Sequence, residues 1–413
     1  MRVDLAYGRA GTVVEVPDDA EVIVPRQLPA LVDQAGAVRE AVAPRLSGLV
    51  DGTTPVVLVF PDLTRPMPNR TVLPPLLAEL AARGVPDDHI TLLCATGTHR
   101  QATAAEMEEL LGPEITSRYE VIDHSARHDD HVTVGEVDGV PIRLLRHYVE
   151  AKVRIITGFV EPHFFAGFSG GPKAVCPGLA DTATILEAHH PRRIAHPDAT
   201  FVTRHGNPVH DFVRAAVALA PPQLAVDVTI NQARQITGVF AGPMTETHDA
   251  ACAFAEASAV QRVSAPFDVV VSTNGGHPLD RNLYQAVKGM AAAERIVARD
   301  GVIVMAAACG DGVPEDGAFA ELLTRATTPE QLRHGTGDPA LDVWQAQVLG
   351  RVLQAAEVHM FSDGLSADTI RNAQLHPVRD LSAAVAAALS RRLAPGRLAV
   401  LPEGPLTVAT VVA

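Results

Sequence analysis

The sequence predicts an α/β fold with mostly parallel sheets, arranged as two domains. Short apolar runs typical of buried strands alternate along the chain with segments of helical spacing, and polar loops follow the runs. A chain of 413 residues is long enough for two domains, and an alanine-rich stretch over 249–260 gives way to a new strand at Phe267. We therefore predict an N-terminal α/β domain over 1–265 and a C-terminal α/β domain over 266–413.

In the first domain, predicted strands and helices alternate. Apolar runs predict strands over residues 55–60, 89–94 and 153–160. Leucines recur at helical spacing within 72–84, where Gly84 is the predicted C-terminal cap. Thr103 and Glu106 form a predicted capping box at the start of a further helix.

The second domain repeats the order of strand and loop. Its predicted strands begin the segments 268–278, 300–312 and 356–365, and the first of them is followed by a predicted helix over 280–297. Ligands bind outside the carboxyl ends of strands in open parallel sheets. Polar residues that follow the predicted strands are therefore the first candidates for a site.

Bulk composition excludes several classes of function. The formal net charge is -14, which disfavours binding of nucleic acid through phosphate contacts. The N-terminus has no apolar signal-peptide core, and no run is long enough for a membrane span. The four cysteines, Cys94, Cys176, Cys252 and Cys309, contain no CxxC pair. We therefore expect a cytoplasmic protein that has no disulfides and no thiolate zinc site. We also expect it to bind neither nucleic acid nor membranes.

Lysine is rare in this chain. Of the 34 basic residues only Lys152, Lys173 and Lys288 are lysines, and the others are arginines. A lysine can lose its proton and act as a nucleophile, which an arginine cannot. Lys173 and Lys288 lie in glycine-flanked motifs, so we interpret them as functional. We interpret Lys152 as a lysine retained by chance, without a specific role.

The segment GFSGGPKA, from Gly167 onward, resembles a phosphate-binding loop but departs from it. A P-loop needs glycine before its lysine and a hydroxyl residue after it, whereas this chain has Pro172 and Ala174. Proline also removes a backbone donor. These departures exclude a P-loop NTPase, although Gly170 and Gly171 still permit close approach of the backbone to a phosphate.

Polar residues follow three predicted strands of the first domain. Asp62 and Arg65 follow the first, His99 the second and His163 the third. Arg65 is a natural clamp for a substrate carboxylate, with a local ion pair to Asp62 as the equal alternative. Histidine is the usual general acid or base near neutral pH, and a structural, hydrogen-bonded histidine is the alternative for each.

Two further histidine segments are candidates for a metal. The segment HSARHDDH contains His124, His128, Asp129, Asp130 and His131. Its irregular spacing predicts a solvated surface run rather than the metal site of a hydrolase. His189 and His190 end an apolar, helix-like stretch, and either could bind a metal ion.

Gln285 and Lys288 share one face of the predicted helix over 280–297. An exposed polar face would explain the pair. Because Lys288 is one of so few lysines and precedes Gly289, we predict that the pair faces a ligand.

These motifs together resemble the nickel-pincer lactate racemase family. The matching segments occur in the expected order between residues 62 and 290, and they are DLTRP, TGTHR, EPHFFAGFSGGPKAVCPG, AHHP, GNPVHD and PLDRNLYQAVKGM. The long central motif is highly specific, whereas the short motifs are weak alone. The resemblance implies two α/β domains with the active site in the cleft between them.

The resemblance also implies a cofactor. This is the nickel-pincer nucleotide, pyridinium-3-thioamide-5-thiocarboxylic acid mononucleotide with Ni2+, supplied by cofactor-maturation proteins. Its thioamide tether maps onto Lys173 and its histidine ligand to nickel onto His189. Gly170 and Gly171 are the predicted backbone contacts of the cofactor.

The implied reaction is racemisation or epimerisation of a 2-hydroxy acid. The family's acid/base histidines map onto His99 and His163. One would take the hydroxyl proton while hydride passes reversibly to the cofactor, through a bound 2-keto acid. Arg65, supported by Lys288 and Gln285, would hold the substrate carboxylate. Asp62 would orient the neighbouring groups.

Two other functions remain open at this point. A nicotinamide-dependent 2-hydroxy acid dehydrogenase would use similar arginine and histidine chemistry, but the chain has no GxGxxG turn after a strand. The other function is a non-catalytic cofactor- or ligand-binding protein, and the full set of His99, His163, Lys173 and His189 argues against it. Residues after about 300 match no motif, and the sequence does not identify which 2-hydroxy acid is the substrate.

Overall fold

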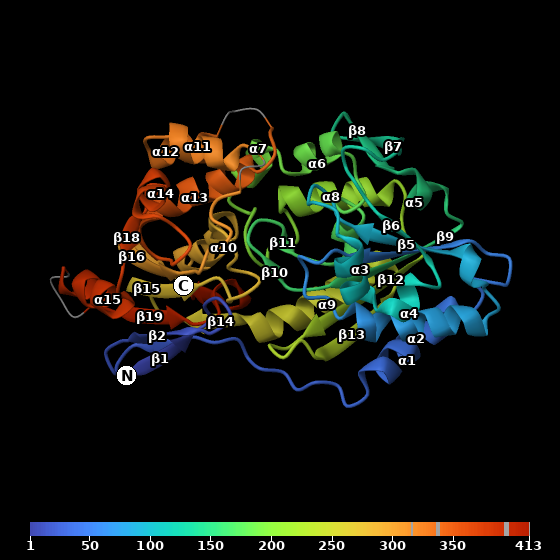
Figure 1. Ribbon diagram of the computed structural model, residues 1–413, viewed down its shortest axis with the longest axis horizontal. Coiled ribbons are helices and arrows are strands. Elements are labelled where there is room, and N and C mark those ends of the chain that lie inside the picture. The colour runs from blue at the N-terminus through green and yellow to red at the C-terminus, as the bar shows by residue number, and fades with distance from the viewer. Residues whose placement is uncertain (315–316, 336–338, 392–395, 413) are drawn as a thin grey trace. The chain divides into compact units, whose positions relative to one another are not determined.

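The computed structural model describes residues 1–314, 317–335, 339–391 and 396–412 as two compact units (Figure 1). The N-terminal unit comprises Gln27–Ala188 and Asp198–Ser258. The C-terminal unit comprises Met1–Arg26, His189–Pro197 and Ala259–Ala413. Met1–Arg26 and His189–Pro197 thus lie in the C-terminal unit, although both fall within the predicted domain 1–265.

The N-terminal unit is built on a six-stranded sheet with the order β13-β12-β9-β4-β5-β6. Its strands are β4 (Val56–Pro61), β5 (Ile90–Ala95), β6 (Glu120–Asp123), β9 (Val153–Phe159), β12 (Leu224–Ile230) and β13 (Ile236–Gly242). Every neighbouring pair is parallel except β12 and β13, which are antiparallel. The carboxyl ends of β9, β4 and β5 therefore lie side by side at one edge.

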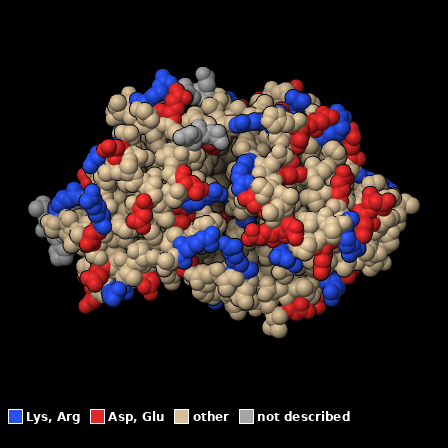
Figure 2. Space-filling view, viewed as in Figure 1, with Lys and Arg blue, Asp and Glu red and all other residues tan. Residues whose placement is uncertain are grey.

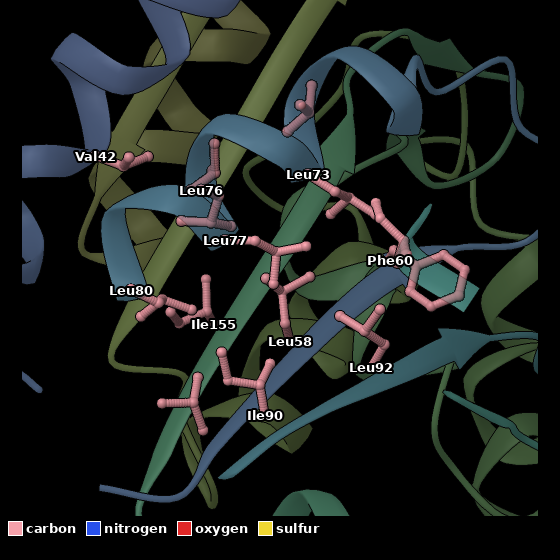
Figure 3. Packing of buried hydrophobic residues seen from close by; sticks show 14 of the residues in the cluster. Val42, Leu58, Phe60, Leu73, Leu76, Leu77, Leu80, Ile90, Leu92 and Ile155 are labelled. Carbon is pink, nitrogen blue, oxygen red and sulfur yellow. The ribbon is translucent and has the colours of Figure 1, made fainter. Parts of the chain in front are cut away.

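Both faces of this sheet are buried. Leu58 and Phe60 of β4 point to one face, where they pack with leucines of α2 (Asn69–Ala82) and with Val42 of α1 (Gln34–Leu46) (Figure 3). Val57 and Val59 point to the other face and pack with residues of α6 (Thr182–Ala188) and α8 (Pro208–Ala218). Side chains alternate along a strand, so burial of both faces requires the continuous apolar run seen in the sequence.

Shorter elements complete the N-terminal unit. They are the hairpin β7 (His131–Val137) and β8 (Val140–Leu145), the pair β10 (Pro162–His163) and β11 (Gly167–Phe168), the 3₁₀ helices η1 (Asp87–His89) and η2 (Gly171–Ala174), and the helices α3 (Ala104–Leu111), α4 (Pro113–Thr116), α5 (Arg146–Glu150) and α9 (Met244–Ala259).

The C-terminal unit has a second six-stranded sheet, with the order β18-β17-β16-β15-β19-β3 and all neighbours parallel. Its strands are β3 (Glu21–Val22), β15 (Phe267–Thr273), β16 (Val297–Ala306), β17 (Ala356–Phe361), β18 (His376–Val378) and β19 (Leu398–Leu401). The pairing of β3 with β19 explains why the first residues of the chain belong to this unit. Residues far apart in sequence are joined here, which no local pattern reveals.

Helices and two small strand pairs complete the C-terminal unit. The helices are α7 (Pro191–Ile194), α10 (Leu283–Glu294), α11 (Phe319–Arg325), α12 (Pro329–His334), α13 (Val343–Ala355), α14 (Ala367–Asn372), α15 (Leu381–Ser390) and the 3₁₀ helix η3 (Gly404–Leu406). The strand pairs are β1 (Arg2–Leu5) with β2 (Thr12–Glu15), and β14 (Val260–Val263) with β20 (Val408–Val411).

The predicted fold class, α/β with mostly parallel sheets, is confirmed. The predicted strands match β4, β5, β9, β15, β16 and β17 to within a few residues. The capping box of Thr103 and Glu106 is present in both directions, and Gly84 has a positive φ of 80° just after α2. Among the described residues, no helix combines the length and apolarity of a membrane span.

The segment 124–131 was predicted to be a solvated surface run, and this is wrong for its two outer histidines. His124 is fully buried and His131 is 7% exposed, and their Nε2 atoms lie 2.9 Å apart. His131 begins β7, whose pairing with β8 draws the side chain inward. No three potential ligands among His, Cys, Asp and Glu come together anywhere in the described parts of the chain, so the pair is not part of a metal cluster.

Acidic and basic side chains are interspersed on the face of the molecule shown in Figure 2. The blue basic groups in this view alternate with red acidic groups rather than forming one broad basic surface. This distribution is in keeping with the net charge of -14.

Candidate functional site

Three loops at the carboxyl edge of the N-terminal sheet carry the predicted polar residues. Asp62 and Arg65 follow β4, His99 follows β5 and His163 follows β9. The strand order places β9, β4 and β5 next to one another in parallel, so the three loops emerge from adjacent strand ends. This is the edge at which open α/β sheets bind ligands.

Asp62 and His99 form the first catalytic candidate. The Asp62 carboxylate is 5% exposed and lies 2.8 Å from Nδ1 of His99, and it also accepts a hydrogen bond from the Thr64 hydroxyl. Burial acts to raise the pKa of the Asp62 carboxyl, but His99 and the charge of Arg65 outweigh it and lower that pKa. The carboxylate thus holds the Nδ1–H of His99, so Nε2 of the neutral ring is left as an acceptor.

This arrangement bears on the two interpretations of Arg65, as a clamp for a substrate carboxylate or as the ion-pair partner of Asp62. The carboxylate of Asp62 pairs with His99, whereas Arg65 acts on it as a nearby charge. Arg65 is partly exposed and follows a tight turn in which its N–H donates to the Asp62 carbonyl. Its guanidinium is therefore in reach of solvent and of a carboxylate ligand.

His163 is held differently from His99. It is 7% exposed, and its ring stacks on Phe164 at 4.9 Å and meets Phe165 edge-on at 4.5 Å. The backbone N–H of Ala166 donates to its Nδ1 over 3.2 Å. With Nδ1 accepting, the proton of the neutral ring sits on Nε2, which makes that atom a donor.

Lys173 lies close to His163 through a shared aromatic ring. The Lys173 Nζ is 5.6 Å from the centre of the Phe165 ring, which also meets the His163 ring edge-on. Lys173 belongs to η2, directly after the Gly170–Gly171 turn. The central motif therefore brings its histidine and its lysine to one aromatic wall.

The glycine turn before Lys173 has a structural cause. Gly170 and Gly171 have positive φ values of 77° and 48°, and the Gly171 N–H donates to the buried carboxylate of Asp227 over 3.0 Å. A Cβ on Gly171 would lie 2.4 Å from Cγ of His248. The turn thus needs glycine to pack on Asp227 and His248, and one of its backbone donors is used inside the protein.

His189 lies in the C-terminal unit, on the segment between α6 and α7. Its ring packs against Trp344 of α13 with centroids 4.6 Å apart, and the Trp344 indole N–H donates to the Tyr284 hydroxyl over 2.7 Å. The neighbouring His190 instead caps α7, because its Nδ1 accepts from the Arg192 N–H. Of the two histidines, His189 is therefore the candidate for a metal.

Gln285 and Lys288 are joined on α10. The Lys288 ammonium donates to Oε1 of Gln285 over 2.6 Å, as the shared helix face predicts. Asn282 caps the helix and its side chain accepts from the Gln285 N–H. Tyr284, which contacts Trp344, precedes Gln285, so α10 links this pair to the residues that surround His189.

Some residues of these clusters were missed by the sequence analysis. Trp344 lies in the region after 300 that matched no motif, and its only sequence signal is that it is the single tryptophan of the chain. Phe165 is part of the central motif but was given no role. Asn207 and His210 belong to the quoted segment GNPVHD and are buried beside that motif.

The chain matches known protein-family models and known proteins. Residues 7–201 match the lactate racemase N-terminal domain, and residues 262–411 match the lactate racemase C-terminal domain. The chain is 31% identical to the lactate racemase of Thermoanaerobacterium thermosaccharolyticum, over 97% of each protein. The chain belongs to the lactate racemase family. The predicted membership and the predicted assignment to the isomerases are thereby confirmed.

Further relatives agree with this membership. The lactate racemase of Lactiplantibacillus plantarum is 34% identical over 87% of this chain and 86% of its own length. The lactate racemase apoprotein structure from Thermoanaerobacterium thermosaccharolyticum superimposes with a TM-score of 0.91 at 30% identity, covering 99% of this chain and 100% of that one. A protein of Thermotoga maritima shares the fold, with a TM-score of 0.71 at 17% identity over 92% of this chain and 98% of its own.

Proposed function

We propose that the chain racemises or epimerises a 2-hydroxy acid, with His99 and His163 as its acid/base pair. The observation that carries this proposal is the opposite anchoring of the two rings. His99 offers a bare Nε2 because Asp62 holds its Nδ1–H, whereas His163 offers an Nε2–H because its Nδ1 accepts from Ala166. A reaction that removes and restores a hydroxyl proton needs both a base and a donor.

His99 is the proposed base for the substrate hydroxyl. When its Nε2 takes the proton, the imidazolium is stabilised by the adjacent, mostly buried carboxylate of Asp62 at 2.8 Å. His163 would meet the substrate oxygen with its Nε2–H and hold it against the Phe164 and Phe165 walls, which exclude water. The oxygen regains a proton from the histidine nearest to it.

Arg65 is the proposed clamp for the substrate carboxylate, since a guanidinium can bind both carboxylate oxygens at once. Lys288 would add a cationic donor for the carboxylate, and Gln285 would orient it, because its Oε1 accepts from the Lys288 ammonium over 2.6 Å. A 2-keto acid held by its carboxylate can rotate without leaving, and this rotation presents its other face. Specificity beyond the carboxylate would depend on residues that these contacts do not identify.

The proposed cofactor is the nickel-pincer nucleotide, held by Lys173 and His189. No group of three protein ligands for a metal occurs in the described residues, so a nickel ion needs donors from outside the chain, and the His189 imidazole would supply one. Lys173 provides the only chemistry at η2 that can form a thioamide, because the arginines favoured elsewhere cannot. When bound, the cofactor would accept a hydride from the substrate carbon and return it.

The test is production of the chain together with cofactor-maturation proteins, followed by three measurements. We expect added mass on the Lys173 peptide, bound nickel, and interconversion of 2-hydroxy acid enantiomers by chiral chromatography. Lys173→Arg is the matched control and should show none of the three. Full racemisation by Lys173→Arg, or an unmodified Lys173 without nickel in an active wild-type chain, would overturn the cofactor assignment.

A panel of single enantiomers identifies the substrate within this class. Short 2-hydroxy acids and sugar acids differ beyond the carboxylate and hydroxyl that Arg65, His99 and His163 would bind. Net oxidation that depends on added nicotinamide, with no change of configuration, would instead support the dehydrogenase function. We also propose a cytoplasmic location, which the four free and buried cysteines support.

A further inference from the structure

A buried pair of histidines lies behind the loop that carries Lys173. His210 and His248 are each 1% exposed, and their rings stack with centroids 5.6 Å apart and an interplanar angle of 19°. Nε2 of His248 lies 3.0 Å from the Ser169 carbonyl oxygen. Both ring nitrogens of His210, by contrast, have no hydrogen-bond partner among the protein atoms described.

The position of His210 is fixed relative to Lys173 by a short series of contacts. Asn207 caps α8, where its side-chain oxygen accepts from the His210 N–H, and its amide donates to the Phe165 carbonyl over 2.9 Å. Phe165 is the residue whose ring lies 5.6 Å from the Lys173 Nζ. Helix α8, which carries His210, also packs against η2, which carries Lys173.

The second histidine connects the pair to the glycine turn. A Cβ on Gly171 would lie 2.4 Å from the His248 ring, so the ring rests directly against the Gly171 backbone. Asp227, which is 1% exposed, accepts from the Gly171 N–H on the same side. The turn that aims Lys173 is therefore built against this cluster.

Burial, and then the charges around it, keep the His210 ring neutral. Burial lowers the pKa of His210 to about 3, and the positive charges of His248, Arg214 and Lys173 act in the same direction, against a smaller effect of Asp249. A neutral imidazole has an acceptor nitrogen. Its low pKa makes this nitrogen a weak base, so it can take a proton only from a strongly acidic donor close by.

A packing role alone explains His210 poorly. Leaving a buried polar nitrogen without a partner is unfavourable, and an apolar side chain of similar size would avoid that cost. Residues that carry such a cost inside a folded protein are concentrated at functional sites. The unpartnered imidazole therefore suggests a role in the modification of Lys173, in which one of its nitrogens accepts a proton.

We propose that His210 is the proton acceptor for acylation of Lys173, the step that tethers the cofactor. This inference rests on the proposed function, in which Lys173 carries the tether. The neutral Nζ attacks the thiocarbonyl carbon of an activated thiocarboxylic derivative of the nucleotide, so that the product is a thioamide. A C–N bond forms, the bond to the leaving group breaks with its electron pair, and the proton lost from Nζ passes to His210.

The amine of Lys173 gains the most from such a base after the attack. The nitrogen becomes strongly acidic once the C–N bond has formed, and the adduct reverts unless that proton is removed. A positioned general base contributes about 10²–10⁴-fold in comparable proton transfers. His248 and Asp227 would act as positioning residues, because they contact the Gly171 turn rather than the reacting nitrogen.

The experiment uses the full, cofactor-free chain and a small acyl donor, S-phenyl thioacetate. Acetylation of each lysine is followed over time by peptide mass spectrometry, and Lys152 and Lys288 serve as internal references within the same sample. In the wild-type chain we expect Lys173 to react faster than Lys152, although Lys152 is exposed and Lys173 is partly buried. If Lys173 proves to be the slowest of the three lysines, the proposal is overturned, and this result needs no variant.

The variant His210→Gln keeps a polar side chain but cannot take up the proton. We expect the acetylation rate of Lys173 to fall about tenfold or more, with less than a twofold change at Lys152 and Lys288. His124→Gln, a change at another buried histidine of the same unit, should leave the Lys173 rate unchanged. An unaltered Lys173 rate in His210→Gln would refute the role of His210.

The result is distinguishable from failure of the proposed function. Acetylation of Lys173 that depends on His210 supports the proton acceptor whether or not the chain ever binds nickel. A chain that shows this dependence but stays unmodified when produced with maturation proteins contradicts the tether alone. If the variant His210→Gln carries as much cofactor on Lys173 as the wild-type chain does, the proposed role of His210 is contradicted and the tether is not.

Discussion

The two six-stranded sheets use their strand-end loops in different ways. In the N-terminal unit, the loops after β4, β5 and β9 carry Asp62, His99 and His163. In the C-terminal unit, the corresponding loops are hydrogen-bonded to one another and to the segment between β1 and β2 of the same unit. Asp280 accepts hydrogen bonds from the backbone of Gly8 and of Ala308, both to one carboxylate oxygen.

Further bonds tie the same loops of the C-terminal unit. The Tyr7 hydroxyl donates to Asp363 over 2.8 Å and accepts from the Asp363 N–H over 2.9 Å. The candidate residues of this unit instead come from helices α10 and α13 and from the segment at His189. The sheet of the N-terminal unit thus presents titratable groups at its strand ends. The candidate groups of the C-terminal unit lie on helices and on the segment at His189, and they are proposed to bind metal or substrate.

This difference suggests a division of labour between proton transfer and positioning. Loss of Asp62, His99 or His163, which follow strands of the N-terminal sheet, should lower kcat, because these groups are proposed to move or orient protons. Loss of a group in the C-terminal unit should weaken binding of metal or substrate while leaving the proton transfers in place. Kinetic and binding measurements on single variants separate these two effects.

The largest effect is expected from His99→Gln and His163→Gln. Each should lower kcat about 10²–10⁴-fold, because a glutamine cannot exchange protons near neutral pH, while bound nickel stays at the wild-type level. Asp62→Asn should lower kcat less, about 10–100-fold, by presenting an N–H to Nδ1 of His99 and so forcing the proton onto Nε2. The measurement is steady-state racemisation with nickel content as the control.

Two results with these variants would contradict the proposed difference between the two units. Asp62→Asn retaining full activity would mean that the tautomer of His99 does not matter. Loss of nickel in His99→Gln would place that residue with the binding groups, and the division between the two units would fail.

An intermediate effect is expected from Trp344 in the C-terminal unit. Trp344→Leu removes the ring that packs 4.6 Å from His189, and it should reduce nickel retention about 10-fold against a chelator. Trp344→Phe keeps a ring but loses the bond to Tyr284, so it should retain more nickel than Trp344→Leu. Equal retention by wild type and Trp344→Leu would show that this ring does not support His189.

The contrast between the sheets also shows what sequence could predict. Continuous apolar runs identified the strands of both sheets, because a strand buried on both faces needs them. Parallel topology then placed Asp62, His99 and His163 at adjacent strand ends. The bond of Asp62 to His99 was not predicted, since only the folded loops decide whether Asp62 meets His99 or Arg65.

What sequence could not predict depends on contacts over long separations. Residues Met1–Arg26 join the C-terminal unit because β3 pairs with β19, nearly four hundred residues away along the chain. The contact of His189 with Trp344 joins two segments that share no pattern. The segment 124–131 looks polar and exposed, yet strand pairing buries its outer histidines. Local periodicity carries no information on such pairings.

The smallest effect concerns stability in acid, which should differ between the two units. Burial, followed by the charge of His131, lowers the pKa of His124 to about 3, and the pKa of His210 is also about 3. An unfolded histidine titrates near pH 6.5. Below about pH 6.5 these histidines bind protons in the unfolded chain but stay neutral in the folded chain. Their contribution to the free energy of unfolding is therefore complete above pH 6.5 and decreases as the pH falls towards 3.

The expected loss is about 2 kcal/mol for each such histidine near pH 5, and both histidines belong to the N-terminal unit. In the C-terminal unit burial also lowers the pKa of His359, but Glu357 opposes this shift. We therefore expect the N-terminal unit to unfold first as the pH falls. Trp344, the single tryptophan, reports on the C-terminal unit alone, whereas far-ultraviolet circular dichroism reports on both.

Loss of circular dichroism signal should thus begin at a higher pH than the change in tryptophan fluorescence. His131→Gln should shift the first transition to lower pH, because it removes the repulsive partner of His124 and keeps a neutral group within hydrogen-bonding reach of its Nε2. A single transition seen by both probes, unmoved by His131→Gln, would show that the buried histidines do not set the acid limit of the N-terminal unit.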